Sequence, residues 1–158
     1  MDATDLHILR LLQADNRRSA AELGAEVGLS VSAASDRVRR LNAAGIITAN
    51  RAVADPRRAG LGLLAFSFVD LEPRADELAF AEALRRLPEV QEAHHVTGPH
   101  SWMLKLRVRD TAALQHFMAN HLKPLPGVLR TETVIALDTA KETTELALPA
   151  ALPETAAP

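Results

Sequence analysis

Two short helix-forming segments joined by a glycine turn constrain the fold of this chain most strongly. Over residues 19–27, the first serine and Glu22 three positions later are typical of a capping box, in which each side chain accepts from the backbone N–H of the other. A turn is expected at Gly28, and a second helix over residues 30–44, with a serine cap and Gly45 at its end. Two short helices with a glycine in the turn between them form a helix-turn-helix, which places its second helix in a DNA groove. The sequence therefore predicts DNA binding.

The second of these helices separates apolar from polar side chains. At 100° per residue, Ala34, Val38 and Leu41 fall within one narrow arc, which we expect to pack on the other helices. The opposite side carries hydroxyls and guanidinium groups, which suit contacts with phosphates and base edges. The expected DNA-binding residues are Ser30, Ser32, Ser35, Asp36, Arg37, Arg39 and Arg40. A merely solvated charged face is the alternative, and the capping box and glycine signals argue against it.

Two members of this set have a second interpretation. Arg37 lies beside the apolar arc and could brace the fold instead of contacting DNA. Asp36 places a carboxylate where it would repel phosphate. It could accept a hydrogen bond from the amino group of cytosine, or be held by Arg39 or Arg40. If it instead opposes DNA, the unit is an interaction module whose helix-turn-helix no longer binds DNA.

Charge is divided unevenly along the chain, whose formal net charge is −2. Residues 1–60 carry a balance of +2 and residues 61–158 a balance of −4, which indicates a front half that faces nucleic acid. The absence of cysteine excludes disulfides, thiolate zinc sites and cysteine nucleophiles. Neither a signal peptide nor an apolar stretch of membrane-spanning length is visible, so we expect a cytoplasmic protein without a membrane partner.

The spacing of apolar residues changes once along the chain. We expect a three-helix domain of winged or plain helix-turn-helix type over residues 1–49, its first helix over residues 4–14, and then a linker strand over residues 50–60. In residues 61–148 the expected order is strand (61–71), helix (from Asp76), strand (90–97), strand (102–108), helix (114–122) and strand (128–137). This βαββαβ order is that of a ferredoxin-like sandwich, so the fold class is α+β. The Pro- and Ala-rich tail, residues 149–158, is expected to be disordered.

Both faces of the predicted sheet are apolar. In the first strand, Leu64, Phe66 and Phe68 alternate with Ala65 and Val69. Helices cover only one side of a four-stranded sheet in this fold, so the second apolar side requires another sheet. Its simplest source is a second copy of the chain, which makes a homodimer the expected minimum assembly.

Three segments of the chain resemble one known family. Similarity to the N-terminal domain of the Lrp/AsnC (feast/famine) transcriptional regulators is carried by DLHILRLLQADNRRSAAELGAEVGLSVSAASDRVRRLNAAGII, and similarity to their C-terminal ligand-binding domain by VTGPHSWMLKLRV and LPGVLRTETVIAL. The resemblance extends from about Asp2 to Leu148. It implies a sequence-specific regulator that forms a homodimer, tetramer or octamer and binds a pseudo-palindromic operator in double-stranded DNA. It also implies a small-molecule effector, such as an amino acid or another metabolite, bound between subunits.

The same resemblance locates the effector near residues 97–101. Family members often have V-T-G-D-Y-D there, whereas this chain has V-T-G-P-H-S, so both acidic positions are lost. Pro99 and Ser101 cannot pair with an ammonium group, but the loop backbone remains and His100 adds a titratable donor or acceptor. A different ligand, or none, stays open. The expected effector-binding residues are Thr97, Gly98, Pro99, His100, Ser101, Thr131 and Thr133, although the two threonines equally fit a role as β-branched strand formers.

Histidines are the other candidates for chemistry. His94 and His95 are adjacent in a strand and point to opposite faces, while His116 and His121 are five positions apart on a helix rather than three or four. We therefore expect no metal site and no cofactor. The alternative from another class is a tetrapyrrole enzyme that resembles the sirohaem decarboxylases, with His94, His95 and His100 as acids or substrate contacts. The arginines of the helix expected over residues 30–44 favour a regulator over an enzyme.

Overall fold

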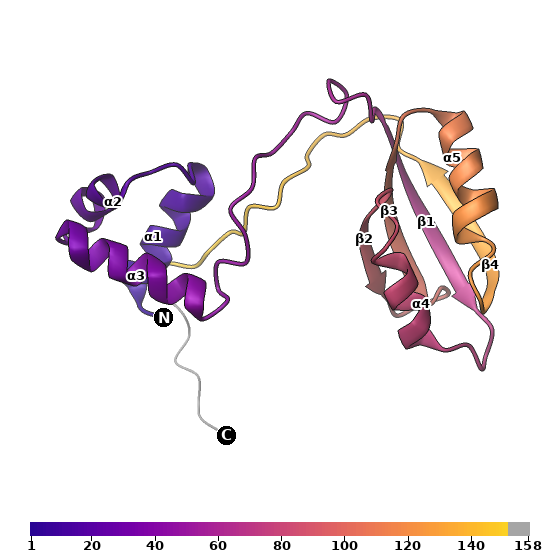
Figure 1. Ribbon diagram of the computed structural model, residues 1–158, viewed down its shortest axis with the longest axis horizontal. Helices are drawn as coiled ribbons and strands as arrows, with labels where there is room; N and C mark the ends of the chain where they lie inside the picture. Colours follow the sequence, from indigo (N-terminus) through magenta and orange to yellow (C-terminus); the bar gives the residue numbers. More distant parts are fainter. Residues whose placement is uncertain (152–158) are drawn as a thin grey trace. The chain divides into compact units, whose positions relative to one another are not determined.

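The structure is a computed structural model that describes residues 1–151 of the chain. It forms two compact units, one of Met1–Ala52 with the described residues from Glu142 onward, and one of Val53–Lys141. Figure 1 shows the helices of the first unit in indigo to purple and the sheet and helices of the second in magenta to orange. The predicted α+β fold class is confirmed.

Three helices make up the first unit: α1 (Ala3–Ala14), α2 (Ala20–Val27) and α3 (Val31–Ala43). Each begins beside a side chain that accepts from the free N–H groups of its first turn. Asp2 caps α1, and Ser19 and Glu22 form the predicted capping box of α2. Ser30 caps α3 by accepting from the N–H of Ala33 at 3.2 Å. The three helices enclose a core of Ile8, Leu9, Leu23, Ala34 and Leu41.

The turn between α2 and α3 depends on two glycines. Gly28 ends α2 in the left-handed conformation (φ 69°), which glycine adopts without the steric cost that other residues incur. One turn earlier, Gly24 is buried, and its carbonyl accepts from the N–H of Leu29 at 2.8 Å. A Cβ atom at Gly24 would lie 2.6 Å from the carbonyl oxygen of Leu29. The close approach of helix and turn therefore requires glycine at this position and fixes where α3 begins.

The segment after α3 differs from the prediction. Gly45 follows the helix with φ 68°, as expected of a stop signal. Residues 46–62, all of which are described, form turns and irregular backbone, so the linker strand and the wing are absent from this segment. Within it, the Asp55 carboxylate accepts from the N–H groups of Arg57 and Arg58 and forms a local turn in place of an extended strand.

The second unit is a four-stranded antiparallel sheet with helices on one face. Its elements follow in the order β1 (Leu63–Leu71), α4 (Glu77–Leu84), β2 (Val90–His95), β3 (Trp102–Val108), α5 (Thr111–Phe117), the π-helical turn η1 (Met118–Leu122) and β4 (Val128–Ile135). The strand order across the sheet is β2-β3-β1-β4. This order is the one that two interleaved βαβ crossovers produce, which confirms the predicted ferredoxin-like sandwich.

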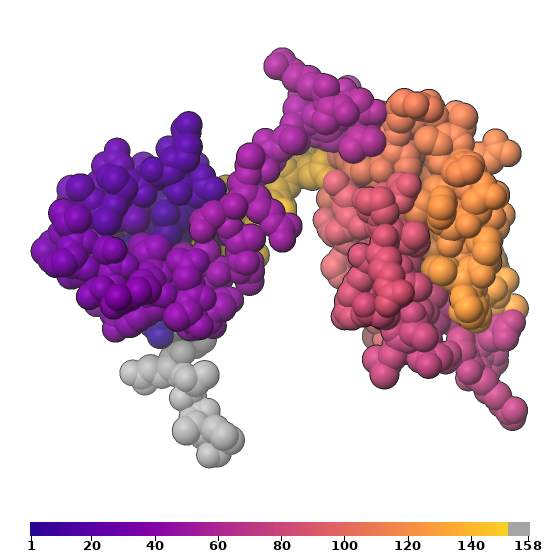
Figure 2. All heavy atoms as spheres, viewed as in Figure 1, coloured from indigo at the N-terminus to yellow at the C-terminus, as the bar shows by residue number. Residues whose placement is uncertain are grey.

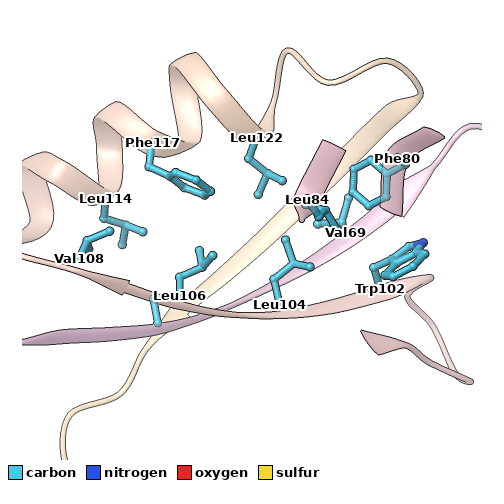
Figure 3. Packing of buried hydrophobic residues seen from close by; sticks show 11 residues of the cluster. Val69, Phe80, Leu84, Trp102, Leu104, Leu106, Val108, Leu114, Phe117 and Leu122 are labelled. Atoms are coloured by element: carbon cyan, nitrogen blue, oxygen red, sulfur yellow. The ribbon is translucent and has the colours of Figure 1, made fainter. Parts of the chain in front are cut away.

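The core of the second unit lies between the helices and one face of the sheet. Figure 3 shows apolar side chains of β1 and β3 directed toward those of α4, α5 and η1, among them Val69, Trp102, Leu104, Leu106, Phe80, Leu84, Phe117 and Leu122. The opposite face, which we call the open face, carries Phe66, Phe68, Asp70, Lys105, Glu132 and Val134. Phe66 and Phe68 are half-buried there, and Val134 is 47% exposed. The described helices of this unit, α4, α5 and η1, pack on the other face, as the two-sided sequence pattern predicts.

The end of the second unit also differs from the prediction. Residues 142–148 were assigned to the sheet domain by their sequence, but they group with the first unit. Leu148 packs against the core of α1–α3, and the carbonyl of Pro149 accepts a hydrogen bond from Arg10 at 2.8 Å. The expected disordered tail, residues 149–158, thus begins at a residue that is docked, and residues 152–158 lie outside the described part of the chain.

Candidate nucleic-acid interface and effector site

The side of α3 that faces away from the core is polar and accessible. Ala34 and Leu41 are buried and hold the helix against α1 and α2, as the predicted apolar arc requires. Among the residues predicted to bind DNA, Arg37 is half-buried, whereas the exposed ones are Ser30, Ser32, Ser35, Asp36, Arg39 and Arg40. The structure therefore presents all of the set except Arg37 on the surface of one helix, ready to contact phosphates and base edges.

Asp36 is held by a neighbouring arginine. Its Oδ1 lies 2.9 Å from Nη2 of Arg39, one helical turn away. The pair leaves 61% of the Asp36 side chain and 77% of the Arg39 side chain exposed, so solvent screens it strongly. An exposed pair of this kind contributes roughly 0.3–0.5 kcal/mol. Arg39 thus lies beside the carboxylate in the free protein, and the pair can be broken at little cost when Arg39 meets a phosphate.

Arg37 braces the first unit. Its Nη1 lies 2.6 Å from Oδ2 of Asp2 and 2.7 Å from Oδ1 of Asp5. Asp2 caps α1 and Asp5 lies in the first turn of the same helix, so this arginine ties the start of α1 to α3. Of the two interpretations that the sequence allows, bracing is the one the geometry supports. We therefore assign Arg37 to the fold rather than to the DNA-binding set.

Substitution Arg37→Met is expected to lower the free energy of unfolding of the first unit near neutral pH, because Asp2 and Asp5 lose their shared cation. Hydrogen bonding from Arg37 holds the pKa of Asp2 below its ordinary value of 3.8. A lowered pKa stabilises the fold above that ordinary value, and the stabilisation is lost as the pH falls through the lowered one. The difference between wild type and variant should thus shrink in acid, and urea unfolding at about pH 7 and about pH 3 measures it. A difference that grows in acid would contradict the assignment.

A cavity of about 320 Å³ lies beside α3 in the first unit, whose packed atoms Figure 2 shows in indigo and purple. Its lining joins Ser35, Arg39 and Asn42 of α3 to Asn16 and Arg18, which precede α2. Amide and guanidinium donors of this kind suit phosphate contacts beside a recognition helix. Asn16 and Arg18 are not among the residues predicted to bind DNA, because both lie outside the helical repeat. The one sequence feature that could have pointed to them is the polar run of residues 15–18, just before the capping box of α2.

The loop between β2 and β3 is shaped by its backbone. Gly98 has φ 117°, a conformation that side-chain-bearing residues rarely adopt. The loop is closed by the N–H of Val96, which donates to the carbonyl of Ser101 at 3.0 Å, and is fixed to β1 by the N–H of Ser101, which donates to Val69 at 3.2 Å. Thr97, Gly98 and Pro99 are exposed, whereas His100 and Ser101 are half-buried. The tip of the loop is therefore accessible to a ligand, whereas His100 at its base is packed against the sheet.

That histidine belongs to a charged cluster on the open face. Nδ1 of His100 lies 3.1 Å from Oδ1 of Asp70, and Nε2 lies 3.9 Å from Oε2 of Glu132. Its ring stacks on Phe68 with 5.1 Å between centroids. The side chains of His100 and Asp70 are only 18% and 22% exposed. The structure thus supplies two carboxylates beside a loop that has lost its own acidic positions, and neither carboxylate is among the residues predicted for the effector site.

The two predicted threonines lie on the other side of the sheet. Thr131 pairs with Val69 and Thr133 with Ser67, which both belong to the face covered by helices. Oγ1 of Thr133 lies 2.9 Å from Oγ of Ser67 and 3.8 Å from Sδ of Met118. The structure therefore does not bring these threonines together with residues 97–101. The register between β1 and β4, which the sequence does not reveal, decides the point.

The remaining histidines are partly as expected. His94 and His95 lie on opposite faces of β2, and the ring of His95 stacks on Trp102 with 5.3 Å between centroids. A spacing of five was expected to keep His116 and His121 off one helix face, and this is wrong, because the π-helical turn η1 follows and their rings lie 5.6 Å apart. Within residues 1–151, no group of three or more His, Asp or Glu side chains is arranged to hold a metal ion.

A capped helix-turn-helix and a ferredoxin-like unit with a candidate ligand site, joined in one chain, define a DNA-binding regulator with a separate effector domain. Comparison with protein families agrees with both parts. The AsnC-type helix-turn-helix domain matches residues 1–42, and the Lrp/AsnC ligand binding domain matches residues 64–146. The chain belongs to the Lrp/AsnC family of transcriptional regulators.

Curated relatives and solved structures are similar over nearly the whole chain. The leucine-responsive regulatory proteins of Escherichia coli strain K12 and Klebsiella pneumoniae are each 35% identical over 150 residues, covering 94% of this chain and 92% of theirs. A transcriptional regulator of Neisseria meningitidis, solved as an L-Met complex, is 33% identical with a TM-score of 0.87, covering 92% of this chain and 96% of that one. AsnC of E. coli is 32% identical with a TM-score of 0.85, covering 92% and 97%.

These comparisons confirm a transcriptional regulator with a helix-turn-helix and a ligand-binding domain. They give no support to the tetrapyrrole-enzyme alternative, because the family is one of regulators. As regards membranes, no helix within residues 1–151 combines the length and the apolar character that crossing a bilayer demands.

Proposed function

We propose that the protein binds a pseudo-palindromic operator as a homodimer, with α3 of each subunit in the major groove. The observation that carries this proposal is α3 itself, which is capped, buried on one side and exposes Ser32, Arg39 and Arg40 on the other. Two copies related by a twofold axis present two such helices to successive half-sites, which favours an operator of the same symmetry. Its place of action is then the cytoplasm, on chromosomal DNA.

The open face of the sheet supports the dimer. Phe66 and Phe68 occupy its middle, beside the 47%-exposed Val134. Burying this apolar surface against the same face of a second copy would remove it from water, and a twofold axis makes the contact self-complementary. Tetramers or octamers would assemble from such dimers.

For the effector we infer an amino acid or another small metabolite bound near residues 97–101. The solved relative of N. meningitidis is a complex with L-Met, which supports this class of ligand. The carboxylates of Asp70 and Glu132 could pair with the ammonium group of an amino acid. In the free protein His100 contacts both of them. The proposed site therefore comprises the tip of the loop, His100 and these two carboxylates. It leaves out Thr131 and Thr133, which face the helices.

Selection of genomic DNA fragments by the purified protein, sequenced after binding at two salt concentrations, tests the DNA-binding proposal. A discrete pseudo-palindrome that survives the higher salt would establish a specific regulator, and the adjacent genes would indicate which metabolites to test as effectors. Recovery of sequence-blind fragments that disappear at the higher salt would overturn it, because binding that rests on phosphate contacts alone weakens steeply with salt.

Substitution Gly98→Val is expected to abolish any effector response while the fold survives. The φ of 117° strains a β-branched residue by about 1–3 kcal/mol, yet a Cβ there meets no atom within 4 Å, so the change is confined to the loop. Thermal shift assays with the standard amino acids, and operator affinity with and without any that bind, measure the response. Pro99→Ala, on the same exposed loop, is the control. If Gly98→Val instead dissociates the oligomer, the loop is structural and the site lies elsewhere.

A further inference from the structure

Helix α1 holds a segment from the far end of the chain. Nε2 of Gln13 donates to the carbonyl of Leu146 at 3.1 Å, and Oε1 accepts from the N–H of Leu146 at 2.8 Å. Arg10 donates to the carbonyl of Pro149 at 2.8 Å. Between these points Leu148 packs against the core of the first unit. Figure 1 shows this segment, in yellow, reaching α1.

Two independent kinds of contact hold the segment. The amide of Gln13 pairs with the backbone of Leu146 as a neighbouring strand would, so this contact does not depend on the side chain at position 146, which is 68% exposed. The N–H of Leu148 donates to the carbonyl of Leu146 at 2.9 Å, which bends the backbone locally. The apolar contact then comes from the side chain of Leu148, which is half-buried.

The docked segment gives the chain a second connection between its two units. One connection runs through residues 53–62, which follow the first unit, and the other through residues 136–145, which follow β4. Neither can extend by more than ~3.5 Å per residue. The second one starts from the strand that carries Glu132 of the His100 cluster and Val134 of the open face. The chain therefore runs from the candidate effector cluster to residues 146–149, which are held on α1 by hydrogen bonds and an apolar contact.

We propose that α1 is the docking surface for the chain's own residues 146–149, and that this clamp restrains each DNA-binding unit through the second connection. In a dimer, a second connection narrows the range of positions that each recognition helix can take. Without the clamp each unit is tethered by residues 53–62 alone, and the second helix reaches its half-site at a lower effective concentration. The docking stands on the contacts alone, whereas its effect on DNA rests on the proposed function.

Hydrogen exchange on the full-length protein tests the docking. Gln13→Met removes both hydrogen bonds to Leu146 while keeping the length of the side chain, and Leu148→Ala removes the apolar contact. Each is expected to speed the exchange of the Leu146 amide by a factor of about 5 or more. Leu146→Ala is the matched control, because it trims an exposed side chain and keeps the bonded backbone. Equal exchange in all three variants and wild type would overturn the docking.

Binding to a full operator and to a single half-site tests the restraint. Gln13→Met and Leu148→Ala are expected to weaken full-site binding by a factor of about 5 and to leave half-site binding unchanged. An equal loss on both DNA fragments would overturn the restraint, since the segment would then act only on the stability of the helices. If wild-type protein recovers no specific operator, the proposed function fails, and the exchange experiment still decides the docking.

Discussion

Valine at position 24 is expected to abolish sequence-specific DNA binding and to destabilise the first unit. A Cβ at Gly24 would already lie 2.6 Å from the carbonyl oxygen of Leu29, and valine adds two methyl groups to it. That oxygen belongs to the backbone of the turn, so the turn and the start of α3 must move. Overpacking of this kind costs about 1–3 kcal/mol, which lowers the unfolding midpoint of a unit of this size by roughly 4–8 °C per kcal/mol.

The matched control for Gly24→Val is Ala25→Val. Ala25 is exposed on the same helix, so valine there carries the helix-propensity cost of a β-branched residue without the clash. Thermal unfolding by circular dichroism and operator affinity by fluorescence anisotropy measure both variants. We expect Ala25→Val to stay close to wild type in both assays. Specific binding by Gly24→Val at wild-type strength would mean that the tight turn does not set the position of α3.

Signals that act over a few residues were readable from the sequence. Ser19 with Glu22, the serine before α3, and the glycines at positions 28 and 45 each satisfy or terminate backbone hydrogen bonds locally. The strand and helix order of the second unit was readable for the same reason, because the period of apolar residues differs between the two structures. These features give the helix-turn-helix and the ferredoxin-like sandwich directly.

Features that depend on register or on distant contacts were not readable. Thr133 was placed in the effector site by residue type, but its pairing with Ser67 turns it toward the helices. Asp70 comes beside His100 because β1 pairs with β3, and Glu132 because β4 pairs with the other side of β1. A single π-helical turn reverses the expected geometry of His116 and His121, and no residue type marks it in advance.

The ion pairs of α3 could not be predicted from the sequence either. The sequence allowed Asp36 to meet Arg39, Arg40 or cytosine, and allowed Arg37 either a bracing or a DNA-binding role. The structure pairs Asp36 with Arg39 and ties Arg37 to α1. The second pairing required knowing that the start of α1 packs beside the middle of α3, which is a tertiary fact. It leaves Arg39 and Arg40 as the cations on the exposed side of the described helix.

Removing these two cations together is expected to weaken operator binding by about 10- to 100-fold while the fold stays intact. Both side chains are exposed and neither is part of the core, so Arg39→Ala with Arg40→Ala leaves packing unchanged. If they contact phosphates, the slope of log affinity against log salt becomes shallower by about 1 for each lost contact. If they read base edges, affinity falls on the operator and far less on unrelated DNA. Titrations on both kinds of DNA at several salt concentrations separate the two.

Arg85→Ala combined with Arg86→Ala is the matched control for that double variant, because it removes the same number of charges. Both arginines follow α4, are 74% and 76% exposed, and pair with Glu82, at 2.7 Å and 3.8 Å. Their removal touches no surface assigned to DNA, so a small, salt-dependent loss reports the general electrostatic effect alone. Unchanged affinity in the Arg39 and Arg40 double variant would exclude this side of α3 from the interface. Asn16 and Arg18, which line the cavity beside α3, would then be the next residues to substitute.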